Sequence, residues 1–219
     1  MISAARYLRW QNIPCFAHTL NLAVQNAIAE IKELQTKVKT AVEYFKRSPH
    51  AFSKLKEVQK QMGLPEQTVK QDVQTRWNST LPMFDSVLKS RDAIVETLAI
   101  MNPAIVITKE DSEMLEEMCK ILKPFLHITE DVSSEKQVTI SKLILFSQCL
   151  RKHFEKYDTA NKPRQVLSLI RKIKDELDRH FKDIEDRAML AKATLRDPRF
   201  KKQAFLSTNS YNKAKQSVI

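Results

Sequence analysis

The sequence predicts an all-α protein, and its composition and its apolar periodicity point to that class. Its 219 residues include a single glycine, Gly63, so the glycines that tight β-hairpins need are missing. Leu, Lys, Glu, Gln and Ala are abundant, and apolar side chains recur every three or four residues, as on one face of an amphipathic helix. The hydrophobic content of 42% is enough to build a sizeable core.

Seven segments carry this helical periodicity, and proline marks several of their ends. The first helix is predicted from Leu20 to Phe45 and should stop at Ser48-Pro49, because proline disfavours helical geometry in the residue before it. Another helix should begin at Thr108 or Asp111 and contain Pro124. The remaining helices are expected near residues 52–62, 77–101, 140–157, 164–186 and 188–195, and residues 206–219 should form a frayed tail.

The chain is basic, with 37 Lys and Arg residues, 26 Asp and Glu residues and a net charge of +11. A charge of this size favours contact with polyanions, although it carries no information about base sequence. Residues 37–60 hold seven basic and two acidic residues, residues 104–135 hold three basic and eight acidic residues, and residues 192–219 hold seven basic residues and one acidic residue. Nucleic acid should prefer the two basic regions, and the alternative is that these lysines are simply solvated.

Three cysteines, an odd number, accompany no secretory signal and no apolar run of membrane length. Reduced thiols in the cytosol or nucleus fit this pattern best, so we expect an intracellular protein that is not secreted. Cys15 and His18 have the spacing of half a zinc site, but the other cysteines and histidines lie on separate predicted segments. We therefore expect no metal and no cofactor.

Three short strings stand out from the helical background: Cys15-Phe16-Ala17-His18-Thr19-Leu20-Asn21-Leu22, Thr75-Arg76-Trp77-Asn78-Ser79 and Asp197-Pro198-Arg199-Phe200-Lys201. Each is weak alone, but their types, order and separation resemble the core of hAT-family transposases and their domesticated BED-zinc-finger relatives. The resemblance covers about Ala4 to Phe205. It implies that residues 1–30 are a remnant of a ribonuclease-H-like α/β domain and that residues 31–205 are the family's helical insertion domain.

The resemblance also implies that this chain is not an enzyme. In the family, two catalytic aspartates precede the Cys-x-x-His string and a catalytic glutamate follows the Asp-Pro-Arg-Phe string. Asp72 lies where the family has a non-catalytic acid. The sequence itself offers no Gly-rich phosphate loop, no nucleophile elbow and no Cys-His pair with an orienting acid. The resemblance places the protein in the nucleus.

Arg76 and Trp77 are the sharpest candidates for nucleic-acid contact. A guanidinium can pair with a phosphate while a neighbouring indole stacks on a base, and such stacking is worth about 1–3 kcal/mol per base in single-strand binders. The resemblance implies this role, because the family's tryptophan stacks on bases at the transposon end. The alternative is that Trp77 anchors the start of a helix in the core, and the sequence leaves both interpretations open.

The other candidate residues come from the resemblance and from charge. The resemblance implies that His18 is a polar group near bound DNA and that Cys15 packs beside it. The string of Asp197, Pro198, Arg199 and Phe200 is interpreted as a structural helix end. The basic side chains expected to contact phosphates are Lys46, Arg47, Lys54 and Lys56.

Two functions remain open from the sequence. The first is a DNA-interacting helical module that binds weakly and mostly without base specificity. The second is a protein–protein scaffold or a non-functional fragment of a longer transposase, with other parts of a transposase or a host nuclear protein as partner. Neither involves a membrane or a small-molecule substrate. Residues 37–60 converging on Arg76 and Trp77 would favour the first function, and large exposed apolar patches would favour the second.

Overall fold

A computed structural model describes residues 14–73, 77–134, 139–157 and 160–218 of the chain. These residues form helices joined by loops, with no β-strand among them, which confirms the predicted all-α class. The elements in chain order are α2 (Phe16–Ile28), η1 (Ala29–Ile31), α3 (Lys32–Arg47), α4 (Pro49–Gln61), η2 (Trp77–Ser79), α5 (Thr80–Lys89), α6 (Arg91–Met101), α7 (Lys109–Val132), η3 (Ile140–Lys142), α8 (Leu143–Glu155), α9 (Arg164–Phe181), η4 (Ile184–Asp186), α10 (Ala188–Arg196), η5 (Lys201–Ala204) and α11 (Thr208–Gln216).

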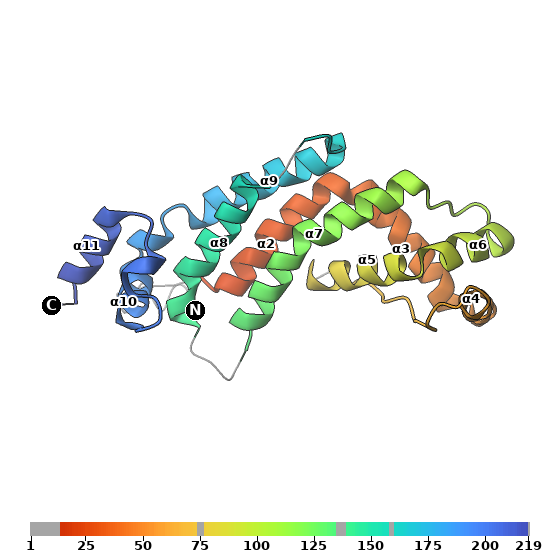
Figure 1. Cartoon of the computed structure of the whole chain (residues 1–219), viewed down its shortest axis with the longest axis horizontal. Helices are drawn as coiled ribbons and strands as arrows, with labels where there is room; N and C mark the ends of the chain where they lie inside the picture. The colour runs from red at the N-terminus through yellow and green to blue at the C-terminus, as the bar shows by residue number, and fades with distance from the viewer. Residues whose placement is uncertain (1–13, 74–76, 135–138, 158–159, 219) are drawn as a thin grey trace, which may run out of the picture.

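The helices form an elongated molecule with three regions (Figure 1). In the middle, α2 packs on both α7 and α9, and α8 packs against the same pair. At one end, α4 packs on α6, while α5 runs back along α7. At the other end, α10 and α11 pack together. A single apolar core connects all three regions, from Phe16 on α2 to Ala214 on α11.

Two of the predicted helix starts are confirmed by their capping hydrogen bonds. The Ser48 hydroxyl accepts a hydrogen bond from the backbone N–H of Ala51 at 3.1 Å, and Pro49 occupies the first position of α4. At the start of α7, the Thr108 hydroxyl accepts from the Asp111 backbone at 3.1 Å, and the Asp111 carboxylate accepts from the Thr108 backbone at 2.9 Å. This reciprocal pair is a capping box, which satisfies two backbone donors that the helix itself leaves free.

Two predicted helices are each divided in two. The segment Leu20–Phe45 is interrupted by η1, and Ile31 has a φ of −116° and a ψ of 23°. The predicted helix over residues 77–101 is broken at Ser90, between α5 and α6. Ser90 accepts a hydrogen bond at 2.9 Å from the amide of the fully buried Gln59, so the break supplies a polar partner inside the core. The apolar periodicity continues across both breaks, which is why the sequence did not reveal them.

The predicted frayed tail is wrong for residues 208–216, which form α11. The Ser207 hydroxyl caps this helix by accepting from the Ser210 backbone at 3.2 Å, and the Ser210 hydroxyl donates to Asp186 at 3.0 Å. Only small side chains, Ser210 and Ala214, are buried on α11, so the segment lacks the large apolar residues that announce a helix. The proposed domain boundaries at residues 30 and 205 stay predictions.

Trp77 is part of the core, with 2% of its surface exposed. Its indole meets Phe125 of α7 edge to face, with ring centroids 6.3 Å apart, and Phe125 lies 5.5 Å from Phe154 of α8. The Trp77 backbone N–H donates to the Asn21 side chain of α2 at 3.3 Å. The stacking role considered for Trp77 is therefore corrected, because an indole buried to this degree has no free face for a base.

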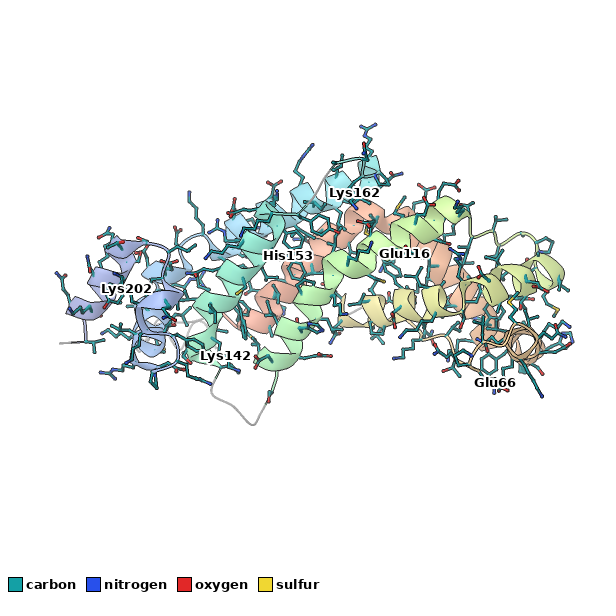
Figure 2. The ribbon with its side chains drawn as sticks, in the orientation of Figure 1. Glu66, Glu116, Lys142, His153, Lys162 and Lys202 are labelled. Carbon is teal, nitrogen blue, oxygen red and sulfur yellow. The ribbon has the colours of Figure 1, made fainter. Side chains whose placement is uncertain are left out.

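Glu117 of α7 is the centre of a polar network that joins α7 to the end of α8 and the start of α9. Its carboxylate accepts from Lys120 at 2.8 Å and from the Tyr157 hydroxyl at 3.2 Å, and Lys162 lies 2.8 Å away. Figure 2 shows Lys162 at the turn that leads into α9. Burial alone would raise the pKa of Glu117, but the hydrogen bonds and charges of Lys120 and Lys162 lower it to about 2.

Replacing Trp77 with Ala should destabilise the fold by about 3–5 kcal/mol, because it removes a large buried ring and leaves a cavity beside Phe125. Urea unfolding followed by circular dichroism measures this change. Trp77→Phe is the matched control and should lose clearly less, since it keeps an aromatic ring against Phe125. A loss below about 1 kcal/mol for Trp77→Ala would contradict the core placement of the indole.

Glu117→Gln should lower the free energy of unfolding by roughly 1–3 kcal/mol near pH 7. The pKa of Glu117 is depressed in the folded state, so its contribution is complete above the ordinary value of 4.5 and is lost as the pH falls towards 2. The difference between wild type and variant should therefore shrink on acidification below pH 4.5. The exposed neighbour Glu116 provides the control, and an equal, pH-independent loss in Glu116→Gln would contradict this assignment.

Candidate nucleic-acid interface

A hollow of about 470 Å³, lined by both polar and apolar side chains, lies between α2, the start of α3 and the loop that precedes η2. Trp77 forms part of its wall, so the hollow is anchored directly on the aromatic core. Its polar lining residues are Gln25, Lys32, Gln35, Thr36, Lys39, Asp72 and Thr80. This is where the structure gathers cationic and hydrogen-bonding groups next to Trp77.

Lys32 and Lys39 supply the positive charge of this hollow. They lie seven residues apart on α3, with Gln35 between them, and this spacing places all three on one side of the helix. Neither lysine has an ion-pair partner within the described ranges, so both charges are available to an incoming anion. Lys39 belongs to the basic region 37–60, but neither lysine was named among the candidate contact residues, although the recurrence of polar residues at 32, 35, 36 and 39 is a signal that could have found them.

Asp72 lines the hollow and connects the segments around it by hydrogen bonds. Its buried carboxylate accepts from the hydroxyls of Ser79 at 2.6 Å and Thr80 at 3.0 Å, and from the Gln35 amide at 3.4 Å. These contacts tie the loop before η2 to the start of α5 and to α3. Because both carboxylate oxygens accept hydrogen bonds, Asp72 acts in this structure as a connection between segments, and it forms no ion pair with Lys32 or Lys39.

Polar residues on α2 extend the same surface towards the start of the described chain. Asn21 accepts from the Trp77 backbone and donates to Gln25 at 3.2 Å, and Gln25 lines the hollow. The exposed His18 precedes Asn21 by three residues, which puts it about one helical turn away on the same side of α2. We define the polar stripe as His18, Asn21, Gln25, Lys32, Gln35 and Lys39.

The four basic residues predicted from charge do not gather around Trp77. Arg47 pairs with Glu43 at 3.4 Å, Lys54 with Glu57 at 3.0 Å and Lys56 with Glu66 at 3.8 Å. Lys46 is exposed and has no ion-pair partner within the described ranges, but it does not line the hollow. Figure 2 shows Glu66 beside α4, at the end of the molecule away from α10. Arg47 follows Lys39, the last α3 residue that lines the hollow, by eight residues, so about 12 Å of helix separates it from the hollow. These four residues therefore do not meet the condition of convergence on Trp77 that would favour the DNA-interacting function, because the chain turns from α3 into α4 beyond the hollow.

Two other residues, a metal site and a membrane span were also considered from the sequence. Arg76 lies outside the described residues, and its phosphate contact stays a prediction. Cys15 is exposed at the start of α2, where its backbone carbonyl accepts from Thr19 at 2.9 Å. Within the described ranges, no three His, Cys, Asp or Glu side chains are close enough together to hold a metal ion. Over the same residues, no helix has the length and apolar character that crossing a bilayer requires.

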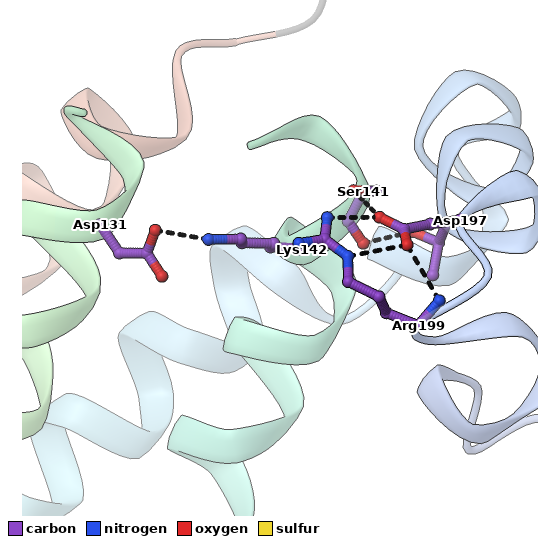
Figure 3. Close-up of polar contacts among 6 residues, drawn as sticks. Asp131, Ser141, Lys142, Asp197 and Arg199 are labelled. Atoms are coloured by element: carbon purple, nitrogen blue, oxygen red, sulfur yellow. Dashed lines mark hydrogen bonds and ion pairs between the residues drawn. The ribbon is translucent and has the colours of Figure 1, made fainter. Parts of the chain in front are cut away.

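The Asp197-Pro198-Arg199-Phe200 string closes α10 and ties it to η3. Asp197 accepts from the Ser141 hydroxyl at 2.7 Å and from the Arg199 guanidinium at 2.9 and 2.7 Å (Figure 3). The Arg199 and Ser141 hydrogen bonds hold the pKa of Asp197 well below its usual range. Lys142, next to Ser141, pairs with Asp131 of α7 at 2.7 Å (Figure 3). In this geometry the string acts as a structural connection, and Arg199 stacks its guanidinium over Phe200 at 5.0 Å.

Comparison with known proteins finds relatives of one kind that align with most of the chain. The family model described as the ZBED1 RNase-like helical domain matches residues 13–121. Zinc finger BED domain-containing protein 4 of Homo sapiens is 27% identical over 211 residues, covering 95% of this chain and 18% of that protein. Zinc finger BED domain-containing protein 6 of Homo sapiens is 30% identical over 199 residues, covering 87% of this chain and 20% of that protein. A Zea mays protein named as an AC transposase is 26% identical over 196 residues, covering 87% of this chain and 24% of that protein.

These relatives are much longer, and the chain spans about a quarter or less of each. The matched model covers the first two of the three strings, and its description as a helical domain agrees with the all-α structure. The resemblance carried by the strings is thereby confirmed. The chain is therefore similar, over most of its length, to the hAT/BED-type group of transposase-derived sequences.

Proposed function

We propose that this chain is a helical module that associates with DNA through phosphate contacts along the polar stripe and catalyses no reaction itself. The observation that carries the proposal is the pair of lysines, Lys32 and Lys39, on the rim of the hollow and without ion-pair partners in the described part of the chain. The net charge of +11 supports the same function at long range, because it raises the local concentration of a polyanion.

The groups in the hollow support backbone contact over base readout. Lysine ammonium groups meet phosphates as point charges, and phosphate contacts position a protein on DNA without reporting its sequence. Trp77 is buried and the Asp72 carboxylate is already engaged, so neither is free to stack on a base or to hold a reacting group. We therefore expect dissociation constants of about 10⁻⁴–10⁻⁶ M at physiological salt, as for non-specific binding.

The names of the relatives agree with a role in association with DNA. They include BED zinc-finger proteins and a transposase. As part of the proposal, we place this chain in the nucleus, where DNA is available to it. Arg76 remains the third predicted cationic contact, since it directly precedes Trp77 at the edge of the hollow. His18 is the predicted polar contact at the other end of the polar stripe.

The scaffold function remains the second candidate, and a specific observation favours it. Arg47, Lys54 and Lys56 all have acidic partners, so much of the basic surface of α3 and α4 is neutralised locally. A chain with few free cations at that end has less to offer to a phosphate backbone. The two functions differ in whether the folded chain binds DNA at low salt.

The proposal predicts that Lys32→Gln combined with Lys39→Gln weakens DNA binding and flattens its salt dependence. Each phosphate contact on duplex DNA contributes about −0.9 to the slope of log affinity against log salt, so losing two contacts should reduce the slope by roughly two. Fluorescence anisotropy with a labelled duplex of about 20 base pairs, titrated at several salt concentrations, measures both quantities.

The matched control is Lys54→Gln combined with Lys56→Gln, which removes the same number of charges from residues that already have acidic partners. We expect it to change the slope by clearly less than the first pair does. Equal effects of the two pairs would show that binding follows net charge alone and would contradict the assigned interface. If the folded wild type fails to bind even at low salt, the scaffold function replaces this proposal.

A further inference from the structure

The outward side of α10 is an unoccupied amphipathic surface. Leu190, Ala191 and Thr194 are buried on the inner side, where α10 packs on η3, α8 and α11. On the outer side, Met189, Lys192, Ala193 and Arg196 follow one another at spacings of three, one and three residues, which aligns them along the helix. We call this outer side, together with Ile140, Pro198 and Arg199, the α10 groove.

The α10 groove consists of two adjoining hollows with an apolar floor. Their volumes are about 380 and 460 Å³, and Ala193 and Arg196 line both. The floor is formed by Ala188, Met189 and Ala193 of α10 with Ile140 and Pro198. Met189 is 46% exposed, although its side chain is apolar. Methionine is flexible and polarisable, and it suits surfaces that adapt to apolar partners.

The rim of the groove is positive. Lys192 and Arg196 have no ion-pair partner among the residues that the structure describes, whereas Arg199 is paired with Asp197 at 2.7 Å. Asp197, the acid among the lining residues, is occupied by Ser141 and Arg199. An occupant should therefore combine an apolar side that covers Met189 with acidic groups that reach Lys192 and Arg196.

We propose that the α10 groove binds an acidic amphipathic helix of a partner protein. A helix with apolar residues at i, i+3 or i+4 and i+7 can cover the floor while its Glu or Asp side chains flank the two cations. The charge complementarity selects this partner over a neutral or basic helix. Nucleic acid fits less well, because phosphate contacts to Lys192 and Arg196 would leave the apolar floor, including the exposed Met189, uncovered.

A second copy of this chain also fits less well. Its acidic helix is α7, but the apolar side of α7, including Leu115, Met118 and Ile121, is buried in the chain's own core. The α10 groove is also separate from Lys32 and Lys39, since α10 lies at one end of the molecule, whereas α3 runs from the middle towards the other end (Figure 1). The proposal is therefore independent of DNA binding, and different variants test the two surfaces.

The test uses the full chain and a fluorescein-labelled synthetic peptide of about 14 residues, with Leu at helical i, i+3, i+7 and i+10 positions and Glu at most others. Fluorescence anisotropy measures its binding. We expect Lys192→Glu combined with Arg196→Glu to weaken binding by at least roughly tenfold and Met189→Ser to weaken it several-fold. The control Lys123→Glu, on the exposed side of α7, should leave binding unchanged. A second peptide with Lys in place of Glu should bind at least roughly tenfold more weakly.

Circular dichroism confirms that each variant is folded, and Met189→Ser keeps the test valid if the double charge reversal destabilises α10. The proposal is overturned if the acidic peptide does not bind or if both groove variants bind it as the wild type does. It is also overturned if a DNA duplex competes for Lys192 and Arg196 as effectively as the peptide. Self-association of the chain that the double variant abolishes would identify a second copy as the occupant and overturn it too.

Discussion

The burial of Trp77 between α2 and α7 is the constraint on which the rest of the structure depends. Its ring packs on Phe125 of α7, which in turn packs on Phe154 of α8, and its backbone N–H donates to Asn21 of α2. Trp77 therefore connects η2 directly to α2 and α7. This placement brings the loop before η2 against α3, where Asp72 connects the two. The polar stripe is the outer surface of that junction, and its position follows from the packing beneath it.

The same packing separates the two surfaces to which we assign binding. Lys32 and Lys39 lie over the Trp77 junction, whereas Lys192 and Arg196 lie on α10 at the far end of the molecule. The first surface is polar and surrounds a hollow, and the second has an apolar floor between free cations. In these two proposals the surface over the Trp77 junction contacts a phosphate backbone and α10 contacts an acidic protein segment, because the cations differ in their apolar surroundings.

Local signals in the sequence predicted the fold class and the starts of α4 and α7, since Ser48-Pro49 and the Thr108–Asp111 pair act within one helical turn. The break at Ser90 and the helix α11 could not be predicted, because a buried partner, Gln59, and small buried residues decide them. For the candidate site, the sequence pointed to the region around Trp77 but not to Lys32 and Lys39 as the contact residues. Which lysines are free depends on tertiary pairs such as Lys56 with Glu66, and charge counting along the chain cannot reveal those pairs.

The most direct measurement of the central claim is lysine footprinting with an amine-acetylating reagent, read by mass spectrometry, with and without a DNA duplex at low salt. A phosphate in contact with an ammonium group shields it from the reagent, so each lysine reports its own contact. The account predicts that DNA protects Lys32 and Lys39, while Lys54 and Lys56, which already have acidic partners, react as in free protein. Protection of Lys54 and Lys56 with full reactivity at Lys32 and Lys39 would contradict it.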